Sequence, residues 1–179
     1  MRLPRTPSQT VGPFFEFGLR TKTELVGADS DGAITIDGRV LDGAGEPVPD
    51  GLVEIWHADA GGRYAGNAGW GRCQTGSDGG YGFTTLKPGA VHEPDGTVQA
   101  PHVTVLCFAR GLLKPVLTRL YFPDEGEANA ADPLLGALAD EAERATLVAT
   151  AKGTGSYGFD IRLQGDGQTV FFTTPAAGQ

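Results

Sequence analysis

Short apolar runs separated by glycine-rich turns constrain the fold of this chain more than any other feature of its sequence. The segments AITIDGRVL (33–41) and SYGFDIRL (156–163) place apolar residues at every second position, which is the period of a half-buried β-strand. Clusters of Asp, Gly and Pro, such as DGAGEPVPDG (42–51), interrupt these runs and predict turns. Repeated short strands with turns between them are typical of a β-sandwich or a barrel.

The same signals place the other elements. Further strands are expected over residues 52–58, 81–86, 101–111, 116–122 and 168–172. The segment 133–151 is rich in Ala, Leu and Glu, and Asp132 before Pro133 has the form of an N-cap followed by proline, which predicts one or two short helices. We therefore expect one all-β domain over residues 1–179. It would have an N-terminal arm and loop over 1–32 and a sandwich core over 33–172 that includes the helical insertion.

Charge and cysteine content exclude several classes of protein. The net charge of −8 and the sequence pI of about 4.8 argue against binding to nucleic acid, which requires clustered Lys and Arg. Cys73 and Cys107 are too few for a disulfide framework, and Cys107 is expected to be a buried apolar residue. The opening MRLPRTPSQT lacks the apolar segment of a signal peptide and no apolar run reaches transmembrane length, so we expect a cytoplasmic location without a membrane partner.

A histidine at the start of the 101–111 strand raises the question of a metal site. His102 and Thr104 share a face, with Cα atoms roughly 6–7 Å apart, because side chains alternate along a strand. A second histidine at position 104 would make half of a metal site, but a lone imidazole is a weak one. We expect His102 to be a hydrogen-bonded structural residue. Adventitious metal binding by His57 and His102 stays open as an alternative, although structural zinc sites use four ligands.

The stretch from Ile36 to Tyr64 resembles the signature of the intradiol ring-cleaving dioxygenases. It matches at Gly38, Val40, Gly45, Val48, the run VEI (53–55), Gly62 and Tyr64. The arm TPSQTVGPFF, the segments APHVTV, FARG and TRLYF, and the C-terminal YGFDIRLQGDGQTVFF also resemble, in order, the α subunits of those family members that consist of α and β chains. The resemblance therefore covers nearly the whole chain.

This resemblance implies a β-sandwich of the intradiol dioxygenase type and a non-haem Fe(III) held by two tyrosines and two histidines on the β subunit. At the matching positions this chain has His102, Thr104 instead of the second histidine, and Val91 instead of one tyrosine. The loop before GRC (71–73) is too short for the other tyrosine. We interpret these positions as vestigial. No metal is expected in this chain, and the iron is expected on the partner β subunit.

The resemblance also implies that Thr10, Gly12, Pro13 and Arg110 line the substrate pocket of that partner. Arg110 lies eight residues beyond His102, which is roughly 26 Å along an unbroken strand. It cannot serve a centre beside His102 unless the strand bends sharply, but it can serve one at the far end of the strand, across an interface. An arginine there can steer a catechol that carries a carboxylate.

The function expected from the resemblance is that of a non-iron-binding α subunit in a hetero-oligomer. The assembled enzyme would convert 3,4-dihydroxybenzoate and dioxygen to 3-carboxy-cis,cis-muconate, and this chain alone would be inactive. Two alternatives remain open. The chain could be a non-catalytic binding or scaffold module on the same sandwich, or a stand-alone intradiol dioxygenase with unusual iron ligands.

Overall fold

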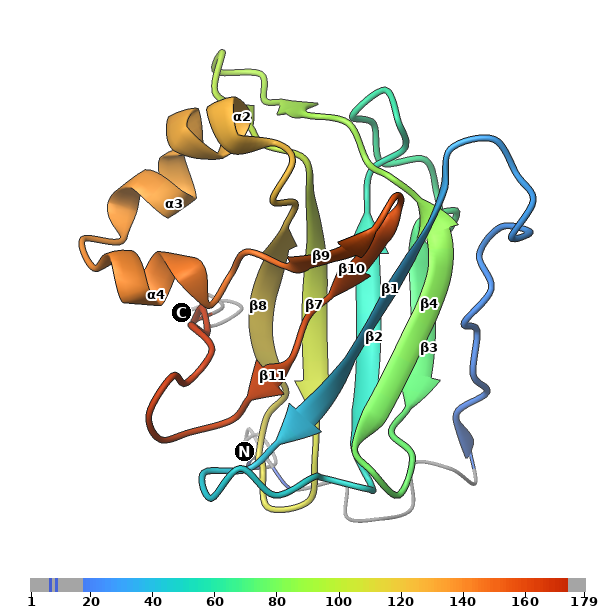
Figure 1. The fold of residues 1–179 in the computed structure, drawn as a ribbon, viewed down its shortest axis with the longest axis vertical. Helices are drawn as coiled ribbons and strands as arrows, with labels where there is room; N and C mark the ends of the chain where they lie inside the picture. Colours follow the sequence, from blue (N-terminus) through green and yellow to red (C-terminus); the bar gives the residue numbers. More distant parts are fainter. Residues whose placement is uncertain (1–6, 8, 10–17, 174–179) are drawn as a thin grey trace, which may run out of the picture.

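Two facing β-sheets form the body of the molecule (Figure 1). The computed structural model describes residues 7, 9 and 18–173. In this part of the chain, one sheet contains β1 (Ala33–Leu41), β4 (Gly80–Leu86), β9 (Thr150–Gly153), β10 (Ser156–Gly158) and β11 (Ile161–Arg162). The other contains β2 (Leu52–His57), β3 (Trp70–Gln74), β7 (His102–Phe108) and β8 (Val116–Tyr121). The predicted all-β sandwich is confirmed.

Strand pairing in the two sheets follows different patterns. In the first sheet, β1 pairs antiparallel with β4 on one edge and parallel with β10 and β11 on the other. In the second sheet the order is β3-β2-β7-β8, and all the pairs are antiparallel. The first pair of the β2–β7 ladder is Leu52 with Phe108, and the last is His57 with Val103. This register decides which residues of β7 share a face with those of β2.

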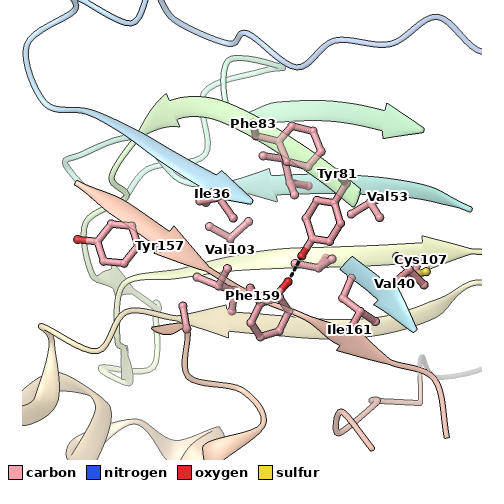
Figure 2. Packing of buried hydrophobic residues seen from close by; sticks show 14 of the residues in the cluster. Ile36, Val40, Val53, Tyr81, Phe83, Val103, Cys107, Tyr157, Phe159 and Ile161 are labelled. Carbon is pink, nitrogen blue, oxygen red and sulfur yellow. Dashed lines mark hydrogen bonds between the residues drawn. The ribbon is translucent and has the colours of Figure 1, made fainter. Parts of the chain in front are cut away.

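Side chains of both sheets interdigitate between them (Figure 2). Ile36 and Val40 of β1 and Val103 of β7 are at most 2% exposed, as the alternating pattern predicts. Cys107 is fully buried with a free thiol, which confirms its expected role as a small apolar residue. Burial of these side chains is the main force that holds the two sheets together.

Gly38 marks a very close approach between β1 and the segment that joins β10 to β11. A Cβ atom at position 38 would lie 1.9 Å from the carbonyl oxygen of Phe159, so no other residue fits without a shift of the backbone. The same carbonyl accepts a 2.5 Å hydrogen bond from the hydroxyl group of Tyr81 (Figure 2). Gly38 of β1 and Tyr81 of β4 therefore both meet the segment between β10 and β11 at one buried carbonyl group.

The helical insertion differs in extent from its prediction. Helices occur at α2 (Gly126–Ala131), α3 (Pro133–Ala137) and α4 (Glu141–Ala145), whereas residues 150 and 151, expected to be helical, lie in β9. The predicted cap is present, because the carboxylate of Asp132 accepts hydrogen bonds from the backbone N–H groups of Leu134 and Leu135. Pairing with β10 explains the strand at 150–153, since tertiary pairing readily overrides weak local helix propensity.

Two further segments form strands that the sequence did not indicate. β3 has no alternating apolar pattern and exists because it pairs with β2. The connection expected over 87–100 contains a small ribbon, β5 (Val91–His92) with β6 (Val98–Gln99). The strand expected over 168–172 is reduced to an isolated bridge between Phe172 and Leu117. None of the helices in the described residues is long and apolar enough to cross a membrane.

Candidate functional site

The positions expected to be a vestigial metal site lie on the outer face of the second sheet. Val103 and Val105 of β7 point into the sandwich core, so His102 and Thr104 point away from it. On the neighbouring strand β8, Tyr121 pairs with His102 and Arg119 pairs with Thr104. Tyr121 also belongs to a small apolar cluster with Leu135 of the helical insertion. The insertion therefore covers this end of the sheet, and His102 is only 2% exposed.

Both ring nitrogens of His102 have a partner. Nδ1 lies 2.8 Å from the carbonyl oxygen of Ala100, and because a carbonyl oxygen can only accept, Nδ1 carries the proton. Nε2 is then the acceptor, and the hydroxyl group of Tyr64 lies 3.4 Å from it. Burial, with the nearby charge of Arg119 as a second cause, lowers the pKa of His102 to about 4. His102 is therefore a neutral, hydrogen-bonded imidazole at neutral pH.

Arg119 brings a permanent positive charge to the same face. Its Nη1 donates a hydrogen bond to the hydroxyl group of Tyr121 at 3.3 Å. Its charge acts on His102 and on Tyr64 to lower their pKa values, so it lies close to both side chains. For Tyr64 partial burial is the larger effect, and the pKa of this phenol is raised. Tyr64 therefore stays protonated at neutral pH, whereas an iron-binding tyrosine must be a phenolate.

These residues do not fit a ferric ion. His102 and Tyr64 are the nearby side chains that could act as metal ligands, and the hydroxyl group of Thr104 would be a weak ligand. Val91 in β5 is a buried apolar residue that offers none. The guanidinium group of Arg119 would repel a trivalent cation. Within residues 7, 9 and 18–173, no group of three or more His, Cys, Asp or Glu side chains is arranged to hold a metal ion.

The alternative pair of His57 and His102 does not form a joint site. In the β2–β7 ladder His57 pairs with Val103, so it points into the core while His102 points outward. Both ring nitrogens of His57 are 2.7 Å from partners, the carbonyl oxygen of Ala58 and the hydroxyl group of Thr85. The two imidazoles therefore lie on opposite faces of one sheet, each in its own hydrogen-bond network.

Arg110 lies at the far end of β7, away from His102. The strand ends at Phe108, and a tight turn follows in which the N–H of Leu112 donates to the carbonyl oxygen of Ala109 at 3.2 Å. Gly111 has φ of +86°, a conformation that glycine adopts without strain. Arg110 is the residue before it, and its Nε lies 3.1 Å from Oδ2 of Asp50. Its side chain is 64% exposed.

The other predicted pocket residues, Thr10, Gly12 and Pro13, lie outside the described residues and stay predictions. Gln9, directly before Thr10, is described. It lines a small recess together with Ala109 and Leu112, which flank Arg110 and Gly111 in the turn. Gln9, the residue before the predicted pocket residue Thr10, thus lies near the turn that contains Arg110.

Comparison with known proteins identifies the family of this chain. A family model described as "Dioxygenase" matches residues 16–165. The chain belongs to the intradiol dioxygenase family. It is 40% identical to the protocatechuate 3,4-dioxygenase alpha chain of Pseudomonas putida, over 95% of this chain and 96% of that one. The likeness to the beta chain of the Burkholderia cepacia enzyme is weaker, at 34% identity over 74% of this chain and 64% of that one.

Solved structures of the intradiol family share the fold. The dioxygenase domain of a carbohydrate-binding fusion protein from Streptomyces sp. SirexAA-E superposes with a TM-score of 0.63 at 31% identity. The match covers 90% of this chain and 99% of that domain. The fold type expected from the sequence resemblance is therefore confirmed.

Sequence reasoning missed two residues and one contact near these positions. The two residues are Asp50 and Arg119, and the contact is that of Tyr64 with His102; they depend on strand register and on loop placement. The register of β2 against β7 could have identified Asp50, but a sequence without pairing information does not fix it.

Proposed function

We propose that this chain is the non-iron-binding α subunit of a protocatechuate 3,4-dioxygenase and that it completes the substrate pocket of an iron-bearing β subunit. The observation that carries the proposal is the state of the expected metal position. There, His102 is hydrogen-bonded on both nitrogens, Thr104 and Val91 stand where ligands would be needed, and Arg119 adds a positive charge. The nearly full-length likeness to an alpha chain supports the same role.

The two subunits would have different roles in the assembled enzyme. The Fe(III) and the oxygen chemistry belong to the β subunit, and the assembled enzyme converts 3,4-dihydroxybenzoate and dioxygen to 3-carboxy-cis,cis-muconate. This chain contributes surface, charge and exclusion of water. Arg110, with Thr10, Gly12 and Pro13 of the arm, is the proposed contribution to the pocket. The exposed guanidinium of Arg110 is suited to the carboxylate of the substrate, because arginine and carboxylate pair in a bidentate manner.

Exposed apolar side chains support a protein partner. Trp56 on the outer face of the second sheet is 47% exposed and Tyr64 beside it is 41% exposed, with their ring centroids 4.8 Å apart. A recess next to Trp56 is lined in part by Trp70 and Leu106. Clusters of exposed aromatic residues of this kind are enriched in protein interfaces.

A paired purification tests the proposal. The chain is produced alone, its β partner alone, and the two together, and each sample is assayed for protocatechuate-dependent oxygen uptake. We expect an inactive lone chain and an active complex that contains both chains. Turnover by the lone chain would support the stand-alone enzyme instead. Equal turnover by the β chain without this chain would support a scaffold module.

A further inference from the structure

We propose that Asp50 is a positioning residue for Arg110: it holds the Nε edge of the guanidinium group and leaves the Nη edge free for the carboxylate of an anionic catechol. This inference rests on the proposed function, because it concerns the pocket that the chain is proposed to complete. It assigns a role to a side chain that lies far from the vestigial metal position.

Strand register brings the two residues together. The β2–β7 ladder is antiparallel and begins with Leu52 opposite Phe108. Continuing the same register two residues further places Asp50 opposite Arg110, and the ion pair of 3.1 Å between Oδ2 and Nε occurs there. The ion pair thus continues the ladder outward from its first backbone pair, Leu52 with Phe108.

The backbone on the Asp50 side is held rigidly. Thr75 is 5% exposed, and its hydroxyl group accepts a 2.8 Å hydrogen bond from the N–H of Gly51 and donates a 2.7 Å hydrogen bond to the carbonyl oxygen of Val48. The N–H of Thr75 also donates to the carbonyl oxygen of Gly51 at 2.9 Å. One buried threonine therefore holds the Asp50–Gly51 peptide group and the carbonyl group of Val48, two residues before Asp50.

The ion pair differs from an ordinary surface pair in the burial of its acid. The Asp50 side chain is only 19% exposed, and its Oδ1 is buried without a hydrogen-bond partner among the described residues. A buried carboxylate oxygen without a donor is costly and rare, so its presence beside Arg110 requires an explanation. A simple need for surface stability would not explain it, since exposed ion pairs contribute little.

The geometry of arginine completes the argument. A guanidinium group has five N–H donors in a planar fork, and the Asp50 carboxylate forms an ion pair with it on the Nε side. In the proposed arrangement the two Nη groups stay available, and together they can meet a carboxylate with two parallel hydrogen bonds. By fixing Nε, Asp50 lowers the entropy that Arg110 loses when it binds the ligand.

The test uses the assembled αβ enzyme and two substrates, protocatechuate and catechol, which lacks the carboxylate. The quantity measured is the ratio of their kcat/KM values in four variants: Arg110→Gln, Asp50→Asn, the double variant, and Glu46→Gln as a control. Glu46→Gln removes an exposed carboxylate from the same connection between β1 and β2. We expect the ratio to fall about tenfold or more in Arg110→Gln and by a smaller factor in Asp50→Asn, the range for a lost charge-assisted hydrogen bond.

The double variant should be no worse than Arg110→Gln, and Glu46→Gln should match the wild type. Asp50→Glu, which keeps the charge, should recover part of the ratio and serves as the second variant if Asp50→Asn does not assemble. Equal losses with both substrates would mean a purely structural role and would overturn the inference. Wild-type kcat/KM values for both substrates in Asp50→Asn or Arg110→Gln would also overturn it, while the α-subunit proposal would stand. Failure of the two wild-type chains to form an active complex would instead reject the proposed function.

Discussion

The hydroxyl group of Tyr64 lies 3.4 Å from Nε2 of His102, on the outer face of the second sheet. A metal ligand would use this nitrogen to bind the ion, but here it accepts a hydrogen bond from a protonated phenol. With Nδ1 bonded to Ala100, the imidazole has no free nitrogen. The expected metal position is thus filled by a stable polar network, and this has consequences that can be measured.

Restoring the second histidine should not restore iron binding. Thr104→His recreates the His-x-His pair, but Val91 still supplies no ligand and Arg119 still repels a cation. We expect no stoichiometric Fe(III) and no visible colour after iron loading, measured by metal analysis and absorption. Addition of Val91→Tyr and Arg119→Gln should give detectable binding. Stoichiometric iron in the Thr104→His chain would show that the charge of Arg119 is not the barrier.

Stability should fall on acidification. Burial lowers the pKa of His102 to about 4 from its usual 6.5, and burial also lowers the pKa of His57. Between these two pH values the unfolded chain binds a proton at His102 that the folded chain does not, so the free energy of unfolding decreases as the pH falls through this window. The loss attributable to His102 is about 3 kcal/mol.

Urea unfolding at about pH 7 and about pH 4 measures this loss. The His102→Gln variant should lose less stability between the two conditions than the wild type. The same loss in both proteins would assign the acid sensitivity to other groups.

Removing the Tyr81 hydroxyl should destabilise the sandwich. Tyr81→Phe leaves the buried carbonyl oxygen of Phe159 without this donor, which costs about 1–3 kcal/mol. Tyr157→Phe is the matched control, because the Tyr157 hydroxyl donates to Asp124, a carboxylate that also pairs with Lys87. Denaturant unfolding should show the larger effect for Tyr81. If both variants lose equal stability, the Tyr81 bond has no special weight.

A conservative change at Arg110 should separate charge from geometry. Arg110→Lys keeps the positive charge but loses the planar fork that binds a carboxylate at two points. In the αβ enzyme we expect KM for protocatechuate to rise several-fold, roughly midway to the effect of Arg110→Gln, with iron content unchanged. Steady-state kinetics with metal analysis measures both. Wild-type KM in the lysine variant would show that charge alone suffices.

Periodicity predicted the parts of the fold in which burial alternates. The strand at 33–41 has the predicted bounds, and Cys107 is buried as expected. The N-cap at Asp132 was readable because its chemistry is local. In contrast, β3 and β9 have no strong pattern of their own and form because a neighbouring strand offers an edge. Pairing of this kind depends on the whole fold rather than on a short window of sequence.

In the candidate site, too, some features could be predicted from the sequence and others could not. The assignment of His102, Thr104 and Val91 followed from the family resemblance, and the distance of Arg110 from His102 followed from strand geometry. The neighbours of these residues did not. Arg119 reaches the metal position because β8 pairs with β7, and Asp50 reaches Arg110 because β2 pairs with β7. Contacts between residues far apart in sequence require a register that only the three-dimensional structure provides.

The most direct measurement is the location of iron in the assembled enzyme. The α and β chains are co-expressed with ⁵⁷Fe and purified as a complex. The subunits are then separated under non-denaturing conditions, and iron is determined in each by native mass spectrometry and metal analysis. We predict one iron per αβ pair, all of it with the β chain, and a colourless α chain. Iron that stays with this chain in stoichiometric amount would contradict the proposed role, and Tyr64 and His102 would then have to be tested as ligands.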